Sequence, residues 1–351
     1  MGLSIRQVGS DDLPAAVRLF ELKDGRSYDA ETIHQTVCKF DPERILVWIA
    51  FDGAEPVGMT MMLIRELDVD GRRLKAGYWA NLYIRPEYRQ YLLYPRLVFA
   101  MTSALRKHDN PVLYTSVRLP EVAQAHVKLG FMKLGELAVR AKLLRPARLF
   151  MRYKGWPIGT PLAALPDLLY RGLLKLGSSK RNGSAGYELT PHLTLSQFAS
   201  LLNVAHYKVR QVWSAKRIEE RYASNREGEP YVLVGARRNG TVVGAAVWRP
   251  AVRGNGVRAG VLMDLACRTG EERAARSLLA AAEWSALNSG CDVMLRLNDH
   301  CNSSQLIDRE GYWSSPERYA VLLWPPQAAR ENVALADLRG WRYAFGDHDA
   351  F

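Results

Sequence analysis

Residues 76–107 begin with the run AGYWANLYIRPEYR. Residues 76–84 are aromatic and apolar and contain no proline, which predicts a strand that is buried on much of both faces. A tight turn is expected at 85–89. Apolar residues recur at helical spacing beyond Pro95, which predicts a helix that starts at this proline and continues to Lys107. A strand that enters a helix through a tight turn directs unpaired amides and the positive end of the helix dipole at one point, which suits a phosphate.

The segment 82–89, LYIRPEYR, resembles the core motif of the GCN5-related N-acetyltransferase (GNAT) superfamily, in which a strand ends in V-x-P-x-x-R. In that superfamily R-x-x-G-x-G/A follows, and its amides hold the pyrophosphate of coenzyme A. The chain keeps Arg89 but has Leu92 and Tyr94 in place of the glycines, which let the backbone approach the phosphates. The resemblance implies acyl-CoA as the donor substrate. The residues expected to bind it are Leu82, Ile84, Arg85, Arg89, Gln90, Tyr91, Leu92, Leu93, Tyr94 and Arg96.

Strand and helix patterns continue on both sides of this segment. They predict a strand at 4–8, helices at 12–22 and 30–40, a hairpin at 45–62, a strand at 112–117, a helix at 121–129 and a strand at 131–144. This order of elements is that of the GNAT fold. The resemblance therefore implies an α/β (α+β) domain in which helices flank a mixed, mainly antiparallel central sheet.

The same pattern begins again at residue 187. Residues 259–268 repeat the central strand, with Ala-Gly, Leu and Arg in register 183 residues after their counterparts, and a hairpin with an Asn-Gly turn precedes them. Such repetition indicates two copies of one domain. We predict the following division: GNAT-like domain 1 at 1–145, a basic amphipathic linker at 146–186, GNAT-like domain 2 at 187–330, and an aromatic C-terminal tail at 331–351 that docks on a domain.

The two copies differ at the turn after the central strand. In the second copy, Glu271 and Glu272 open the helix and already complement the dipole that would attract a phosphate. In the first copy, three arginines surround the turn and Glu87 is the only acid close in sequence. An anionic donor is therefore expected in the first copy, and the second copy is expected to be a scaffold or to shape the substrate site.

Two polar residues of the first copy are predicted to be catalytic, His126 and Asn81. His126 precedes Gly130 by four residues, where members of the superfamily commonly place the Tyr that protonates the departing thiolate. The helical pattern turns His126 inward, so the alternative is a hydrogen-bonded core histidine. Asn81 lies on the central strand, and Asp264 is its counterpart in the second copy. Each could bind or deprotonate an amine, or be a buried polar residue that a neighbouring strand satisfies.

The chain is basic, with a formal net charge of +12, and the excess is concentrated in one segment. Ten Lys and Arg stand between Arg140 and Arg181 against the single Asp167, interleaved with apolar residues. Such a segment is either a solvated surface or a docking face for transfer RNA, an acyl carrier protein or an anionic membrane surface. Prolines and charges exclude a spanning helix at 156–176, but 165–176 could form a short amphipathic helix that packs on a domain or lies on a membrane.

The length of 351 residues and an apolar content of 48% suffice for two domain cores. Four cysteines without C-x-x-C spacing indicate neither a zinc site nor a disulfide framework, so a reducing cytoplasm and no metal are expected. The first residues lack the apolar core of a signal peptide, and Arg6 stands where a myristoylation signal requires Ser or Thr.

These patterns together predict an N-acyltransferase that moves an acyl group from an activated donor, with acyl-CoA expected, to a small amine. One alternative is a transferase that depends on aminoacyl-tRNA or an acyl carrier protein, because tandem GNAT-like domains without the phosphate glycines resemble the Fem family of aminoacyltransferases. Another alternative is a non-catalytic ligand-binding protein. The sequence does not indicate the acceptor, the acyl group or the oligomeric state.

Overall fold

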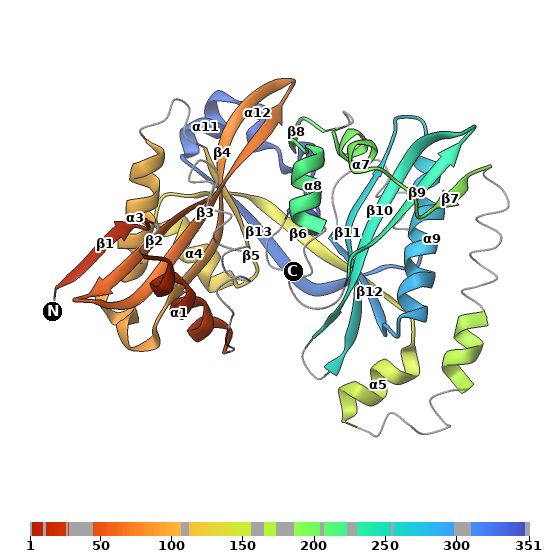
Figure 1. Cartoon of the computed structure of the whole chain (residues 1–351), viewed down its shortest axis with the longest axis horizontal. Helices are drawn as coiled ribbons and strands as arrows, with labels where there is room; N and C mark the ends of the chain where they lie inside the picture. Colours follow the sequence, from red (N-terminus) through yellow and green to blue (C-terminus); the bar gives the residue numbers. More distant parts are fainter. Residues whose placement is uncertain are drawn as a thin grey trace. The chain divides into compact units, whose positions relative to one another are not determined.

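The structure is a computed structural model. It describes residues 2–9, 12–25, 27, 45–106, 112–155, 165–172, 186–203, 207–222, 230–253, 256–297 and 310–347. Its ribbon is shown in Figure 1. The chain divides into two compact units, which are described separately below. The first contains mainly residues 1–135 and 320–338, and the second contains mainly 136–319 and 339–349.

The first unit is built on strands in the order β1-β2-β3-β4-β5-β13. These strands are β1 (Leu3–Gln7), β2 (Ile45–Asp52), β3 (Glu55–Val69), β4 (Arg72–Ile84), β5 (Leu113–Val117) and β13 (Trp313–Trp324). Its helices are α1 (Leu13–Asp24), the 3-10 helix η2 (Pro86–Tyr91), α3 (Leu93–Leu105), α4 (Pro120–Lys128), α11 (Pro326–Glu331) and α12 (Val333–Ala336). Neighbouring strands are antiparallel except β4 and β5, which are parallel.

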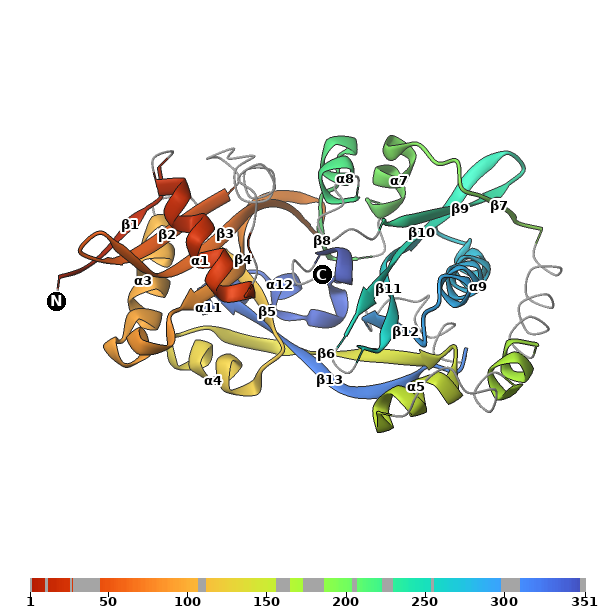
Figure 2. The ribbon, with the colours of Figure 1, turned by 60° about the horizontal axis from the view of Figure 1, so that its bottom comes forward.

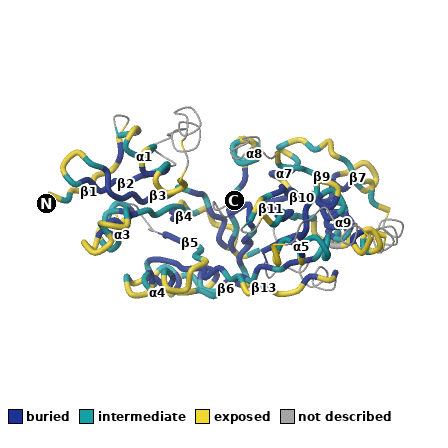
Figure 3. The backbone as a smooth tube through the Cα atoms, turned by 90° about the horizontal axis from the view of Figure 1, so that it is seen from below, coloured by how far each residue is buried: buried dark blue, intermediate teal, exposed yellow. Residues whose placement is uncertain are grey.

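Alternation along β2 places apolar side chains on both faces of this sheet. Val47 and Ile49 pack in the cluster that includes α1, whereas Trp48 and Ala50 pack in the cluster that includes α3. Figure 3 shows α1 and α3 on opposite sides of these strands. The β3–β4 hairpin closes on Asp70 and Gly71, which both have positive φ, as a tight two-residue turn requires.

The predicted start of the helix after the central strand was wrong. The helix after the central strand begins at Leu93 rather than at Pro95, because η2 and Leu92 complete the turn first. Asp12 does precede α1, but its carboxylate accepts hydrogen bonds from Arg6 and the Gly9 amide and does not cap the helix. The predicted helix at 30–40 lies outside the described residues.

The second unit has strands in the order β6-β12-β11-β10-β9-β7. These strands are β6 (Met132–Leu143), β7 (Glu188–Thr190), β9 (Val232–Arg238), β10 (Thr241–Val252), β11 (Arg258–Cys267) and β12 (Val293–Leu297), and a short β8 (Val209–Gln211) pairs with Trp341. Its helices are α5 (Pro146–Lys154), a helix at 165–172, α7 (Leu195–Leu202), α8 (Ala215–Tyr222), α9 (Glu272–Asn288) and the 3-10 helices η4 (Leu338–Gly340) and η5 (Phe345–Asp347). In Figure 2, α7 and α9 lie on opposite sides of β9–β11.

The central strands of the two units share an irregularity. Ala80 is an extra residue in β4, because Met61 faces Asn81 while Met62 faces Trp79. Met263 is likewise an extra residue in β11, because the register with β10 shifts between Val247 and Trp248. Met263 follows Ala80 by the same 183 residues that separate the repeated sequence motifs. A bulge at the same position of both strands supports two copies of one structure.

Each unit is completed by a strand from the other half of the sequence. Residues 320–324 of β13 pair with β5 in the first unit, and residues 139–143 of β6 pair with β12 in the second unit. The compact units are therefore not contiguous in sequence. The predicted boundaries at 1–145, 146–186, 187–330 and 331–351 describe the sequence repeat and stay a prediction.

The core of the second unit contains a buried ion pair and the aromatic tail. Lys142 Nζ of β6 lies 2.6 Å from Glu283 Oε2 of α9, and both side chains are buried. Trp341, Tyr343 and Phe345 of the tail are buried as well. This confirms the prediction that the aromatic C-terminal residues dock on a domain.

Candidate active site

The candidate site of the first unit lies where β4 and β5 stop pairing. The parallel ladder joins Gly77 to Leu113 and Tyr78 to Tyr114, and it extends no further in the described chain. Beyond it, the Thr115 hydroxyl donates to the Trp79 carbonyl at 2.9 Å, so a side chain replaces the missing backbone bond. The bulge at Ala80 follows immediately. The backbone of β4 from this bulge onward is therefore released from β5.

The turn after β4 has the backbone conformation that glycine favours, although it contains no glycine. Leu92 adopts φ +55° and ψ +29° at the start of α3. The left-handed region costs a non-glycine residue about 1–2 kcal/mol. The Leu92 side chain is 70% exposed, whereas Tyr94 turns toward the interior. The side chains of the two residues that replace the glycines of the motif thus point in opposite directions, Leu92 to solvent and Tyr94 to the core. No side chain caps the first turn of α3.

One of the three arginines at this turn is already neutralised. Arg85 Nη1 lies 2.5 Å from a carboxylate oxygen of Glu55 in β3, and its Nε and Nη2 contact Glu87 at 2.8 and 2.6 Å. Glu87 is the only acid close to the turn in sequence, and the β2–β3 hairpin brings in Glu55 as a second. With two carboxylates on one guanidinium, Arg85 carries little net attraction for a phosphate.

The other predicted binding residues of the turn divide into exposed and buried groups. Arg89 is exposed, and the one contact the described structure gives it is a long hydrogen bond of 3.5 Å to the Ile84 carbonyl. Arg96 is exposed and donates to the Leu3 carbonyl at 3.0 Å. Gln90 and Tyr91 are exposed, whereas Leu82, Ile84 and Leu93 belong to the core under α3. Arg89 is thus the cation of this turn that the structure leaves most accessible to an anion.

His126 is buried in an aromatic cluster. Its side chain is 3% exposed, and its ring centroid lies 4.3 Å from that of Trp79 and 5.2 Å from that of Phe131. The Nδ1 atom lies 2.7 Å from the Val122 carbonyl and 2.8 Å from the Tyr94 hydroxyl. Burial lowers the pKa of His126 to about 4, against the opposing effect of the Val122 hydrogen bond. The imidazole is therefore neutral at pH 7.

These contacts fix the proton on the imidazole. A carbonyl can only accept, so the short contact to Val122 places the proton of the neutral ring on Nδ1. The Tyr94 oxygen can then only accept from Nδ1–H, which leaves the phenolic proton of Tyr94 free to donate elsewhere. Burial raises the pKa of Tyr94 well above its usual range, so this proton is retained. The pair holds a hydroxyl donor in a defined place.

Asn81 is the other residue predicted to be catalytic. Its Oδ1 accepts from Lys23 Nζ of α1 at 2.7 Å, and its backbone carbonyl accepts from the Thr60 hydroxyl and the Trp79 indole, each at 3.2 Å. Among the described residues, no contact joins the Asn81 side chain to His126. The structure therefore brings His126 and Tyr94 together, and it connects them to Asn81 only through Trp79.

Trp79 and Lys23 were not found from the sequence. The Trp79 ring lies against the His126 ring at an interplanar angle of 38°, and its indole N–H donates to the carbonyl of Asn81. An aromatic residue in a buried strand carries no sign of such a role. Lys23 ends a helix far from Asn81 in the chain, and only the packing of α1 on the sheet joins them.

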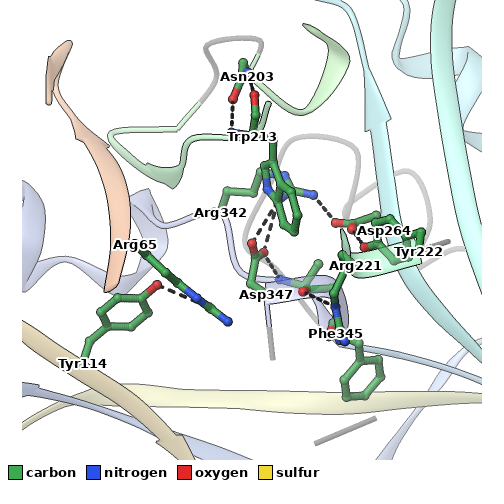
Figure 4. A network of polar contacts seen from close by, with 12 residues as sticks. Arg65, Tyr114, Asn203, Trp213, Arg221, Tyr222, Asp264, Arg342, Phe345 and Asp347 are labelled. Atoms are coloured by element: carbon green, nitrogen blue, oxygen red, sulfur yellow. Dashed lines mark hydrogen bonds and ion pairs between the residues drawn. The ribbon is translucent and has the colours of Figure 1, made fainter. Parts of the chain in front are cut away.

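In the second unit, the chain's own C-terminal residues cover the position equivalent to Asn81 (Figure 4). Asp264 is 1% exposed and bonds to Tyr222 and Arg342, and Arg342 also contacts Asp347 at 3.1 Å. Burial raises the pKa of Asp264, and Arg342 opposes the shift. A Cβ added at Gly346 would meet both Asp264 and Tyr222, so the tail lies directly against this carboxylate. In this copy the polar strand residue is satisfied internally.

The turn of the second copy is also occupied by internal contacts. Glu271 accepts from Tyr187 at 2.7 Å and pairs with Arg238 at 3.1 Å. The predicted counterpart of His126, Ile307, lies outside the described residues. No group of three or more His, Cys, Asp or Glu side chains in the described part of the chain is arranged to hold a metal ion.

The strand order, the bulged central strand and the parted ladder define the GNAT fold, and comparison with solved structures shows this fold. The prediction of the fold class is confirmed. No model of a known protein family matches the sequence, and no curated protein is significantly similar to it.

Three crystal structures illustrate the likeness. A GCN5-related N-acetyltransferase from Anabaena variabilis aligns with a TM-score of 0.62 at 11% identity over 92% of this chain and 72% of its own. Saccharomyces cerevisiae N-myristoyltransferase with bound myristoyl-CoA gives 0.60 at 12% identity over 92% and 83%. A probable N-acyltransferase from Enterococcus faecalis gives 0.64 at 9% identity over 95% and 75%. Likeness at this identity establishes the fold alone.

Proposed function

We propose that this protein is an N-acyltransferase that takes an acyl group from acyl-CoA at the η2–α3 turn of the first unit and transfers it to an amine. The observation that carries the proposal is the turn itself, which keeps the left-handed backbone of a phosphate-binding loop at Leu92, at an uncapped helix start. The structural neighbours include an enzyme with bound myristoyl-CoA. They offer no support for transfer RNA or an acyl carrier protein as the donor.

The residues of the turn fit an anionic donor in part. Arg89 is the cation available to a phosphate, since Arg85 is held by Glu55 and Glu87. The exposed Leu92 side chain leaves the helix start open, although it limits how closely a phosphate can approach the backbone. We therefore expect weaker binding of coenzyme A than a glycine loop would give. The acyl chain and the backbone amides released from β5 are expected to meet at the bulge of β4.

The transfer step requires no group beyond those present. The acceptor nitrogen attacks the thioester carbonyl, a backbone amide of β4 stabilises the oxyanion, and the carbon–sulfur bond breaks. The nitrogen gives up its proton to solvent water and the departing thiolate takes one from solvent, so the protons balance. In this proposal the Tyr94 hydroxyl donates a hydrogen bond to the thiolate, and neutral His126 holds Tyr94 in place. Asn81 lies on the same part of β4 and accepts a hydrogen bond from Lys23, and both residues are proposed to orient the acceptor.

The second copy is proposed to be a scaffold or to shape the substrate, rather than to bind a donor. Its turn carries Glu271, which is committed to Tyr187 and Arg238. A carboxylate at a helix start opposes a pyrophosphate. Its equivalent of Asn81 is covered by the C-terminal residues.

The experiment that tests the proposal measures thiol release from acyl-CoA of several chain lengths with a panel of primary amines. The variants are Arg89→Ala and Tyr94→Phe, and the matched control is Arg72→Ala, which removes an exposed arginine from the β3–β4 hairpin. We expect Arg89→Ala to raise KM for the donor about tenfold, as loss of a charge-assisted contact does. We expect Tyr94→Phe to lower kcat with little change in KM. Unchanged kinetics in both variants would refute the assigned site.

A second candidate function is non-catalytic ligand binding, and burial of His126 is the observation that favours it. A buried imidazole that is neutral at pH 7 is typical of a histidine that only contributes to the core. Mass spectrometry of the purified protein under gentle conditions separates the two. Retained acyl-CoA that is not consumed with any amine would favour ligand binding, whereas repeated turnover of acyl-CoA to an acylated amine would favour catalysis.

A further inference from the structure

The helix at 165–172 of the second unit turns its apolar side to solvent. Leu165, Leu168 and Leu169 are 64%, 59% and 66% exposed. Their spacing of i, i+3 and i+4 places them on one side of the helix. A surface helix in a soluble domain normally turns this stripe to the core. The orientation is therefore the reverse of the usual one.

Polar anchors hold the helix in this orientation. Asp167 is buried and accepts hydrogen bonds from the Ala147 and Arg148 amides, at 3.0 and 3.4 Å, at the start of α5. Arg171 donates to Asn288 Oδ1 at 2.8 Å, and its guanidinium lies 5.1 Å from the Trp284 ring. The polar residues of the helix thus face α5 and α9, and the leucines are left outside. The sequence predicts that this helix either packs on a domain or lies on a membrane. The observed helix packs through its polar residues and exposes an apolar stripe.

The adjacent helix α5 adds aromatic and cationic groups to the same region. Phe150 and Tyr153 are 53% and 72% exposed, and Lys154 Nζ lies 5.9 Å from the Tyr153 ring. Figures 1 and 2 both show α5 beside the helix at 165–172. We call Phe150, Tyr153, Leu165, Leu168 and Leu169 the apolar face. Of the cations between Arg140 and Arg181, Lys142 is buried in its ion pair with Glu283, whereas Lys154 and Arg171 are exposed on these two helices, and Asp167 is turned inward.

We propose that the apolar face docks the protein on an anionic membrane surface. Leucines and aromatic rings enter the boundary between headgroups and acyl chains, while the exposed Lys154 and Arg171 attract anionic headgroups. A nucleic acid would use the cations but would leave the leucines in water. No helix in the described residues is long and apolar enough to cross a bilayer, so the contact is peripheral. This inference does not rest on the proposed acyl transfer.

The test is sedimentation of the full chain with two kinds of vesicle, one of phosphatidylcholine alone and one with an equimolar amount of phosphatidylglycerol. We expect binding to the anionic vesicles only, and we expect added salt to weaken it. Leu168→Ser/Leu169→Ser is expected to lower the partition coefficient about tenfold or more. Lys154→Gln is expected to lower it about fivefold. The control is Val333→Ser, which removes a residue that is 76% exposed on α12 and is expected to leave binding unchanged.

Several outcomes would overturn the proposal. These are no binding to either vesicle, equal binding to both, or wild-type binding by the double leucine variant. Tight binding of transfer RNA that the leucine substitutions do not change would assign the basic segment to a different partner. Because all substituted side chains are exposed, unchanged circular dichroism melting of each variant checks that the fold is intact.

Discussion

Replacing His126 with leucine should remove a pH dependence of stability that this residue imposes on the first unit. In the folded chain, burial lowers its pKa to about 4, whereas an unfolded histidine has a pKa of about 6.5. The unfolded state therefore binds more protons than the folded state between these two values. The free energy of unfolding falls as the pH falls through this window, because folding must exclude the proton.

The size of the effect follows from the shift. A pKa difference of one corresponds to about 1.4 kcal/mol. The folded pKa of His126 is about 2.5 below the unfolded one, so the free energy of unfolding falls by about 3 kcal/mol at pH 4 and by almost nothing at pH 7. Leucine cannot titrate, so His126→Leu loses this dependence. It also loses the hydrogen bonds to Val122 and Tyr94, which lowers stability at every pH alike. Only the difference between the two pH values reports the histidine.

The assay is urea unfolding of the wild type and the variant at pH 7 and at about pH 4.5. Tryptophan fluorescence is a suitable probe because the centroid of the Trp79 ring lies 4.3 Å from that of the imidazole. We expect the wild type to lose about 2–3 kcal/mol more than the variant over this range. His192→Leu, which removes an exposed histidine, should behave as the wild type. Equal pH dependence in wild type and His126→Leu would refute the reasoning and would mean that the imidazole is open to solvent.

Three further predictions concern the turn, the buried ion pair and the tail. Leu92→Gly should leave the free energy of unfolding within about 1 kcal/mol of the wild type and should tighten coenzyme A binding, whereas Leu92→Ile should destabilise the fold by about 1 kcal/mol or more, since a β-branched residue resists positive φ. Calorimetry measures both effects, and a strongly destabilised glycine variant would contradict the inference that Leu92 is strained. Lys142→Met should lower the free energy of unfolding by about 3–5 kcal/mol because Glu283 is left buried and unpaired, and Lys142→Met/Glu283→Leu should recover most of this loss in urea unfolding. A double variant as unstable as the single variant would disprove this explanation. Gly346→Ala should lower stability by about 1–3 kcal/mol in thermal unfolding, because its Cβ would meet the Asp264 carboxylate, and an unchanged melting temperature would count against the tight tail contact.

Local patterns were enough to predict the architecture. The apolar run at 76–84 became β4, the Asp-Gly and Asn-Gly pairs became hairpin turns with positive φ, and the repeat offset of 183 residues reappeared as two equivalent bulges. These signals are carried by residues close together in the chain. The inward direction of His126 was also predicted, because a helical stripe fixes which side chains face the core.

Contacts between distant residues could not be predicted. Glu55 and Arg85 are thirty residues apart, and nothing in either neighbourhood shows that the β2–β3 hairpin brings them together. Lys23 reaches Asn81 only because α1 packs on the sheet. The left-handed Leu92 was hidden because the residue type gives no sign of it, whereas a glycine would have. The sequence thus indicated a candidate turn, whereas the partners that decide the charge of this turn come from tertiary packing.

The exchanged strands β6 and β13 restrict how this chain can be divided or inherited. A gene fragment ending near residue 145 would encode a sheet whose β5 edge lacks the segment 320–324, and exposed edges of this kind recruit strands from other molecules. The second half lacks residues 139–143, which pair with β12, so either half expressed alone would leave an open strand edge of the kind that promotes aggregation.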